Sequence, residues 1–376
     1  MSERRTFKIS DVTVCHDARR VPVRGVDRKP GKFPYYGASG IVDYIDSYLF
    51  DGEFLLVSED GENLRTRKTP VAFMASGKFW VNNHAHILEG NDLCDTRYLC
   101  YVLSKTDVSG YLSGSTQPKL TQASLNSIQV ELPRRSDQES IVKLLAAIDD
   151  KIGVNERIAE TSCELALCLF AEERWSSRTS LSSLCRLRKV QVAPSTLDAR
   201  AVAHHSLPAF DNGQVPDVCS PDKVLSTKFL IDEPSVLLSK LNPDIPRVWR
   251  VEPKAGVPAL ASTEFLVLVP NPTITTAELW AAARQDEFLS RLAARVTGTS
   301  KSHQRVRPDE VLLSDVVDPR ATNVVTRQQV SSLVERAEQA RQEGIALAQL
   351  RDVLLPKLIS GALRIKDAEL LVSAAV

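Results

Sequence analysis

SDQESIVKLLAAIDDKIGVNERIAETSCELALCLFAEERW, residues 136–175, is the stretch that decides the fold. Its apolar residues recur at intervals of three and four, charged residues lie between them, and no proline interrupts the run. This spacing predicts one amphipathic helix of about ten turns. Ser136 followed by Glu139 predicts a capping box at its start. A helix of this length is expected to extend beyond the body of a small domain.

A second stretch of the same kind lies further along the chain. From Val330 to Leu358, apolar residues keep the three-and-four spacing, and Gly361 predicts the end of that helix. A long helix with a single apolar stripe needs a partner to bury it, so the two helices are expected to pair as an antiparallel coiled coil. About 36 residues at 1.5 Å each give a rod of roughly 50 Å. That length is on the order of one and a half turns of B-DNA.

The remaining sequence mixes short β-type runs with turn residues. FLLV at 54–57 and FLVLV at 265–269 are typical of buried strands, and Gly, Asp and Pro residues separate such runs. The sequence therefore predicts an α+β fold with two mixed, β-rich domains that alternate with two helices. The expected order is a first domain at 1–135, a central helix at 136–178, a second domain at 179–322, and a C-terminal helix and tail at 323–376.

The two halves of the chain can be laid over each other with a shift of about 186 residues. Identity between the halves is low, but the order and spacing of the local matches persist. The predicted matches are 54–58 with 235–239, 83–88 with 262–267, and 114–119 with 298–303.

Composition excludes several classes of protein. The seven cysteines include no Cys-x-x-Cys pair, so neither a disulfide framework nor a zinc ribbon is indicated. The first ten residues are polar and no run of about 18 apolar residues follows, which predicts a cytoplasmic protein without a membrane partner. The 47 basic and 47 acidic residues cancel, whereas a stand-alone DNA-binding domain is usually basic. Charge must therefore be judged locally.

Several motifs resemble one known family, the specificity subunits of type I restriction–modification systems. The strongest are PYYGASGIVDY at 34–44, FDGEFLLVSEDG at 50–61 and VNNHAHIL at 81–88, which look like the family's first target recognition domain. Further matches are QPKL at 117–120, IDDKI at 148–152, LLPKLISG at 354–361 and, in the second domain, TSKSHQR at 299–305. The second domain has no counterpart of the Pro-Tyr-Tyr-Gly or Asn-His-Ala-His segments.

The resemblance implies a non-catalytic subunit that reads a bipartite sequence in double-stranded DNA. Its partners would be methyltransferase subunits that use S-adenosylmethionine to methylate adenine, and restriction subunits that use ATP and Mg²⁺. No cofactor is expected on this chain itself. The paired helices would set the gap between the half-sites and dock the partner subunits.

DNA binding needs cations for phosphates and side chains that match base edges. Basic residues are dense near the N-terminus, where Arg4, Arg19 and Arg20 lie, and turn-rich segments supply hydrogen-bonding groups. A solvated charged face is the alternative for each basic cluster, and packing is the alternative for both tyrosines. The candidate DNA-binding residues are Tyr35, Tyr36, Ser39, Arg65, Arg67, Lys68, Lys78, Asn82, Asn83, Gln117, Lys119, Lys301, Ser302, His303, Gln304 and Arg305.

Two other functions stay open as alternatives. A metal-dependent DNA nuclease would be built on Glu59, Asp60 and His84, and His84 and His86 can share a metal if a strand points both to one face. A two-domain scaffold that binds only protein is the second alternative. The sequence has no Gly-x-x-x-x-Gly-Lys loop and no Asn-Pro-Pro-Tyr segment, so ATP use and methyl transfer are not expected of this chain.

Overall fold

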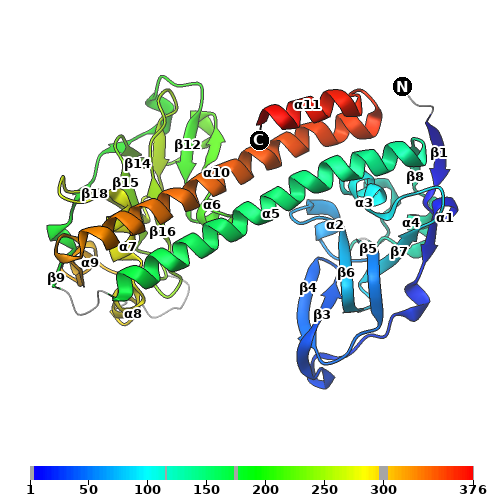
Figure 1. Ribbon diagram of the computed structural model, residues 1–376, viewed down its shortest axis with the longest axis horizontal. Coiled ribbons are helices and arrows are strands. Elements are labelled where there is room, and N and C mark those ends of the chain that lie inside the picture. The colour runs from blue at the N-terminus through cyan, green and yellow to red at the C-terminus, as the bar shows by residue number, and fades with distance from the viewer. Residues whose placement is uncertain (1–3, 115–116, 173–176, 296–303, 376) are drawn as a thin grey trace. The chain divides into compact units, whose positions relative to one another are not determined.

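The computed structural model describes residues 4–114, 117–172, 177–295 and 304–375, and they form two compact units (Figure 1). Unit 1 comprises Met1–Gly153 and Gly344–Val376, and unit 2 comprises Val154–Glu343. The long helices α5 (Arg135–Glu172) and α10 (Val324–Ser360) each contribute residues to both units. Each unit therefore contains a globular part and segments of both long helices. None of the described helices is long and apolar enough to cross a membrane.

Unit 1 is built on a six-stranded sheet with the order β2-β7-β5-β6-β3-β4. Neighbouring strands are antiparallel except β3 and β6, and β1 pairs separately with β8. The elements of unit 1 outside the long helices are β1 (Arg5–Lys8), α1 (Ile9–Val12), β2 (Thr13–Cys15), β3 (Pro30–Gly37), β4 (Gly40–Ile45), β5 (Phe50–Ser58), α2 (Asn63–Thr66), β6 (Ala72–Val81), β7 (Ala85–Gly90), α3 (Thr96–Lys105), α4 (Gln122–Ser127), β8 (Gln129–Leu132) and α11 (Ile365–Ala375).

Two apolar clusters bury the faces of this sheet. Alternate residues of β5 point to opposite sides, so Leu55 packs with the helices whereas Phe54 packs with the aromatic rings of Phe50 and Phe79. The Phe50 and Phe79 rings are stacked with their centres 5.5 Å apart. Burial on both sides explains why residues 54–57 form a continuous apolar run rather than an alternating one.

The two long helices pair as the periodicity predicts. In unit 1, Leu145 of α5 and Leu354 of α10 belong to one buried cluster, and Arg351 donates to Asp149 at 2.8 Å. In unit 2, Ala159 packs with Ala337 and Ala340, and Arg341 contacts Cys163. Residues later in α5 contact residues earlier in α10, so the two helices run antiparallel.

The ends of the helices test two further predictions. Helix α10 ends at Ser360, and Gly361 follows with a φ of 75°, as expected of a residue that terminates a helix in the left-handed region. The predicted capping box is wrong, because α5 already begins at Arg135 and Glu139 forms an ion pair with that residue.

Unit 2 contains a four-stranded sheet, β10-β18-β15-β16, and a five-stranded sheet, β11-β14-β17-β12-β13. A further pair, β9 with β19, corresponds to β1 with β8 of unit 1. The elements of unit 2 outside the long helices are β9 (Arg178–Ser180), β10 (Cys185–Arg188), β11 (Gln191–Val192), β12 (Val202–His205), α6 (Leu207–Asp211), β13 (Asp217–Cys219), β14 (Lys228–Ile231), β15 (Ser235–Ser239), β16 (Val248–Val251), β17 (Ala259–Ala261), β18 (Phe265–Pro270), α7 (Thr276–Ala283), α8 (Asp286–Ala293), α9 (Pro308–Leu312) and β19 (Asp315–Val317).

Strand registers confirm the duplication and correct its alignment. Ser58 of β5 lies opposite Ala85 of β7, and Ser239 of β15 lies opposite Phe265 of β18. The match of 54–58 with 235–239 is therefore right. The match of 83–88 with 262–267 is wrong by one residue, because Ala85 corresponds to Phe265 rather than to Glu264.

Candidate nucleic-acid interface

One end of strand β5 collects several of the predicted DNA-binding residues. The Glu59 amide after β5 donates to the carbonyl of His84 at 2.9 Å, and the Leu120 amide donates to the carbonyl of Glu59 at 2.8 Å. Ser58 Oγ donates to the carbonyl of Ala38 in the β3–β4 turn. Chain segments far apart in sequence thus meet at this point. We call this surface the β5 rim and define it by Ser39, Glu59, Asp60, Asn83, His84, Gln117 and Lys119.

The β5 rim exposes side chains suited to duplex DNA. Ser39, Asn83, Gln117 and Lys119 are all exposed, and they come from three separate connections of unit 1. Amide side chains can pair with adenine edges, and a lysine can contact a phosphate. The structure therefore brings four of the sixteen predicted residues together on one surface.

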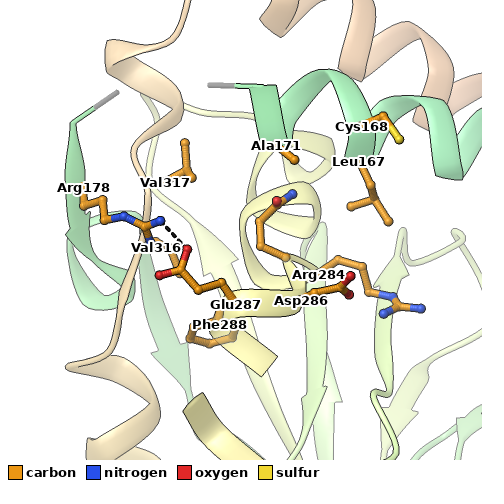
Figure 2. Close-up of a pocket in the computed structure, with 11 residues that line it drawn as sticks. Leu167, Cys168, Ala171, Arg178, Arg284, Asp286, Glu287, Phe288, Val316 and Val317 are labelled. Atoms are coloured by element: carbon orange, nitrogen blue, oxygen red, sulfur yellow. Dashed lines mark hydrogen bonds and ion pairs between the residues drawn. The ribbon is translucent and has the colours of Figure 1, made fainter. Parts of the chain in front are cut away.

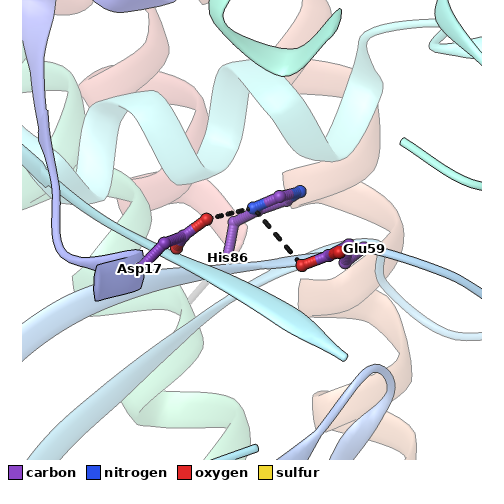
Figure 3. A group of neighbouring side chains, drawn as sticks. All are labelled: Asp17, Glu59 and His86. Atoms are coloured by element: carbon purple, nitrogen blue, oxygen red, sulfur yellow. Dashed lines mark hydrogen bonds and ion pairs between the residues drawn. The ribbon is translucent and has the colours of Figure 1, made fainter. Parts of the chain in front are cut away.

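Glu59 of the rim belongs to a network of charges that includes Asp17 and His86 (Figure 3). Glu59 accepts from Arg20 at 2.6 Å through one carboxylate oxygen, and its other oxygen lies 3.1 Å from Lys119 Nζ. Asp17 pairs with the same Arg20 at 3.2 Å and lies 2.5 Å from His86 Nδ1. The other ring nitrogen of His86 lies 2.8 Å from the carbonyl oxygen of Leu120. The network thus ties β7, the end of β5 and the segment that carries Lys119 to one another.

The pKa values of the two carboxyl groups follow from these contacts. Burial alone raises the pKa of Asp17, but hydrogen bonds from His86 and the Ile87 amide outweigh it and leave that pKa below its ordinary value. Burial likewise raises the pKa of Glu59, and hydrogen bonds from Arg20 and Lys119 outweigh it in the same way. Both groups are therefore held as carboxylates.

The network makes the stability of unit 1 sensitive to acid. A carboxyl group with a lowered folded pKa stabilises the fold fully above its unfolded pKa, about 4, and loses that contribution as pH falls through the folded pKa. We expect the melting temperature to fall steeply below pH 4 and the fall to be shallower in Asp17→Asn. Thermal unfolding between pH 7 and pH 3 measures this. Asp27→Asn is the matched control, because Asp27 is 53% exposed in its ion pair with Arg24, and a shallower fall in that variant too would contradict the assignment.

The network does not fit a metal centre. Ligand atoms of Asp17, Glu59 and His86 lie within 4.8 Å of one another. However, both Glu59 oxygens already face cationic side chains, and both His86 nitrogens face acceptors of the protein. A metal ion would have to replace Arg20 or Lys119, so the donor set suits an internal ion-pair network.

The nuclease arrangement and the shared histidine site are not assembled either. His84 is exposed and pairs with Asp60 at 2.8 Å, whereas His86 is 1% exposed and pairs with Asp17. Because His84 precedes the first residue of β7, the two rings do not follow the strand geometry that the shared site requires. Glu59 belongs to the network of Arg20 rather than to the pair of His84 and Asp60.

Burial corrects the expectation for both tyrosines. Tyr35 is 1% exposed, its hydroxyl bonds to backbone atoms of Val23, and the Arg28 guanidinium lies 4.4 Å from the centre of its ring. Tyr36 is half-buried, and its ring packs edge-on against Phe79. The packing alternative therefore holds for Tyr35, and Tyr36 is largely part of the aromatic cluster.

Asn82 and Arg67 also have internal roles. Asn82 is 8% exposed, and its side-chain oxygen accepts from the amide of His84. Arg67 has a φ of 49° and donates to the carbonyls of Thr106 and Ser104. These contacts shape the connections of unit 1 instead of leaving the two side chains for DNA.

The other basic candidates of unit 1 lie outside the defined rim. Arg65 is exposed and donates to the carbonyl of Gly114 at 3.2 Å. Lys68 is exposed in the connection between α2 and β6. Lys78 is exposed, and its Nζ lies 4.7 Å from the centre of the Tyr48 ring.

The N-terminal arginines are largely committed to the fold. Arg4 donates to the carbonyls of Leu358 and Ile359 near the end of α10. Arg19 lies 4.6 Å from the centre of the Phe50 ring, and Arg20 belongs to the charge network of Glu59. Sequence reasoning treated Arg20 as one of several surface cations. Asp17 lies only three residues away, but the contact that ties Arg20 to the rim is with Glu59, 39 residues along the chain, and has no local signal.

In unit 2, Lys301, Ser302 and His303 lie outside the described residues. Gln304 contributes its backbone carbonyl, which accepts from the amide of Asn242 at 2.8 Å. Arg305 donates to both carboxylate oxygens of Glu264, at 3.0 and 3.1 Å. A carboxylate of the same unit therefore holds its guanidinium, which is 48% exposed.

A hollow of about 350 Å³ lies elsewhere in unit 2 (Figure 2). Leu167 and Ala171 of α5, with Phe288 of α8 and Val317 of β19, give it a largely apolar wall. The charged pair at its edge, Arg178 with Glu287, is matched internally at 2.5 Å. This arrangement supplies neither a nucleophile with a base nor a set of metal ligands.

Comparison with known proteins finds similarity to one family over the first part of the chain. Residues 1–161 match the model of the type I restriction modification DNA specificity domain. A putative type I restriction enzyme specificity subunit of Haemophilus influenzae is 38% identical over 139 residues, which cover 36% of this chain and 34% of that protein. A putative type I specificity subunit of Mycoplasma pneumoniae is 27% identical over 152 residues, which cover 39% and 40%. The matched stretches thus span less than half of either relative.

A solved structure extends the likeness in fold. The crystal structure of a type I restriction–modification S subunit from M. genitalium covers 95% of this chain and 96% of its own, with a TM-score of 0.63 at 13% identity. The first 161 residues are therefore similar to the type I restriction–modification DNA specificity domain, and the chain as a whole shares the fold of that S subunit.

Proposed function

We propose that this protein is the specificity subunit of a type I restriction–modification enzyme, acting in the cytoplasm. It reads a bipartite site in double-stranded DNA, one half-site with each unit, and docks methyltransferase and restriction subunits. The observation that carries the proposal is the β5 rim, where Ser39, Asn83, Gln117 and Lys119 are exposed together within the family domain. Matching groups for base edges and phosphates are what sequence-specific binding requires.

The chain itself is proposed to be non-catalytic. Arg20 and Lys119 hold the carboxylate of Glu59, and Arg20 also holds that of Asp17, so both carboxylates serve as supports for the binding surface. S-adenosylmethionine, ATP and Mg²⁺ would be bound by the partner subunits. Zero net charge agrees with a subunit whose partners supply part of the phosphate neutralisation.

The long helices are proposed to set the gap between the half-sites. Helix α5 has 38 residues and α10 has 37, and both contribute to each unit. Their antiparallel pairing is fixed by buried apolar residues and by the ion pair of Asp149 with Arg351. The length of each helix therefore provides a fixed number of residues between the two reading surfaces.

Substitutions in the rim should relax sequence preference at one half-site. We expect Gln117→Ala or Asn83→Ala to reduce discrimination at a base pair by roughly tenfold, because a good side-chain pair with a base is worth about 1–3 kcal/mol. The measurement is the adenine methylation profile of a random DNA library, with the chain assembled with its methyltransferase subunits. Gln129→Ala is the control, since Gln129 is exposed on β8 outside the rim. Equal profiles for rim and control variants would count against the rim.

A further inference from the structure

The hydrogen bonds that build the β5 rim recur in unit 2. In unit 1, the Glu59 amide donates to His84 and the Leu120 amide donates to Glu59, at 2.9 and 2.8 Å. In unit 2, the amide of Lys240 donates to the carbonyl of Glu264 at 2.9 Å, and the amide of Val306 donates to the carbonyl of Lys240 at 3.1 Å. Each unit therefore closes the end of its central strand with the same two bonds.

Isolated bridges between strands fix the correspondence residue by residue. Asp60 bridges Lys119 in unit 1, and Leu241 bridges Arg305 in unit 2. Lys119 thus corresponds to Arg305, and the predicted match of 114–119 with 298–303 is wrong by two residues. By the same bonds Glu59 corresponds to Lys240, and His84 corresponds to Glu264.

The equivalent cations, Lys119 and Arg305, each pair with a carboxylate, but the two carboxylates come from different positions in their units. Lys119 lies 3.1 Å from the Glu59 carboxylate, at the end of the central strand. Arg305 lies 3.0 Å from the carboxylate of Glu264, and Glu264 lies in the connection that precedes β18. In unit 2 the position equivalent to Glu59 carries Lys240. The carboxylate therefore comes from another position, whereas the ion pair between a cation and a carboxylate is kept. The arrangement is thus maintained although its residues differ.

We propose that unit 2 reads DNA through this equivalent surface, the β15 rim, defined by Lys240, Leu241, Thr263, Glu264, Gln304 and Arg305. This inference rests on the proposed function and assigns the second reading surface. Lys240 and Arg305 contact the DNA. Glu264 is a positioning residue that holds Arg305 in a fixed orientation through two hydrogen bonds, as one carboxylate does for a planar guanidinium.

The charges of the β15 rim support duplex DNA as the ligand. Arg305 is 48% exposed, and Lys240 is half-exposed. Glu264 is the acidic residue between them, and Lys240 and Arg305 both lower the pKa of its carboxyl group. Among the described residues that define the β15 rim, two cations face one carboxylate, and this positive charge suits a DNA phosphate, whose binding releases counterions.

The test uses the full chain assembled with methyltransferase subunits and duplex DNA. We expect Arg305→Ala and Lys240→Ala each to lower the salt dependence of binding by about one unit of slope and to weaken binding by roughly tenfold. In the methylation profile, only the half-site read by unit 2 should change. Arg186→Ala is the matched control, because Arg186 is 51% exposed, pairs with Glu233, and lies at the other end of β18, opposite Val269.

The positioning role of Glu264 is tested by sequence discrimination, which a purely structural role would not change. Glu264→Gln should lower discrimination at one half-site by about tenfold while non-specific binding rises, because Arg305 loses its fixed orientation. Glu264→Asp should recover part of the discrimination. Melting curves check folding, and Arg305→Lys, which keeps the charge, should keep the salt slope but lose discrimination.

The outcomes separate this inference from the proposed function. If Arg305→Ala and Lys240→Ala behave as Arg186→Ala does while Lys119→Ala weakens binding, the β15 rim is overturned and DNA reading by unit 1 stands. If Lys119→Ala, Arg305→Ala and Lys240→Ala all leave binding unchanged, the proposed function fails as well. If Glu264→Gln leaves discrimination unchanged, the positioning role of Glu264 is overturned.

Discussion

An enzyme assembled with a shortened chain should stop methylating the wild-type site. The change removes residues 150–163 from α5 and 337–350 from α10, which is two heptads from each helix. It keeps Asp149 and Arg351, whose ion pair measures 2.8 Å, and it preserves the phase of both apolar stripes. At 1.5 Å per residue, each helix loses about 21 Å. If helix length sets the gap, the half-site sequences persist but the gap between them shortens, and methylation at the original gap is lost.

Genome-wide mapping of methylated adenines measures this gap. A control that keeps the length but carries Arg157→Ala and Glu338→Ala, both within the removed segments, should retain the original gap. An unchanged gap in the shortened protein would refute the ruler. Loss of all methylation with an intact melting curve would instead mean that the two reading surfaces no longer engage one duplex together.

Arg20→Ala should destabilise unit 1 by about 3 kcal/mol. The guanidinium satisfies Asp17 and Glu59, whose side chains are only 7% and 13% exposed. Removal of one partner from a buried ion pair commonly costs about 3–5 kcal/mol, and the lower end is expected because Lys119 and His86 still contact the two carboxylates. Because Glu59 also holds Lys119, the same substitution should weaken DNA binding at the β5 rim.

Arg24→Ala is the matched control for Arg20. Arg24 is 86% exposed in its ion pair with Asp27, and such surface pairs are worth about 0–1 kcal/mol. Urea unfolding followed by hydrogen exchange of the β5 amides measures the free energy of unfolding of unit 1. Equal losses in the two variants would contradict the supporting role of Arg20.

The contrast between Arg20 and Arg24 illustrates what the sequence can predict. The long helices were predictable because residues such as Leu145 and Leu354 repeat with the helical period, and a period is a local property. Each arginine has an aspartate three residues away, Asp17 for Arg20 and Asp27 for Arg24, but the fold brings Glu59 to Arg20 alone. No local pattern distinguishes the two.

The candidate site was predicted only in part for the same reason. Exposed Asn83, Gln117 and Lys119 lie in turn-rich segments as expected, whereas Tyr35 and Arg67, which have equally suitable chemistry, are held by backbone contacts. The overlay of the two halves was wrong by one residue in one segment and by two in another, because connections of different length separate strands whose registers the sequence does not contain. The register of these strands is seen only in the hydrogen bonds between them in the folded structure.

We propose that this chain gives a type I enzyme its DNA sequence preference. The most direct measurement is the adenine methylation map of a host that expresses this chain with its methyltransferase subunits, compared with the same host carrying the combined Gln117→Ala and Arg305→Ala variant. We expect a bipartite motif with the wild-type chain and relaxed preference at both half-sites with the variant. A map without any motif, or one motif shared by both chains, would contradict it.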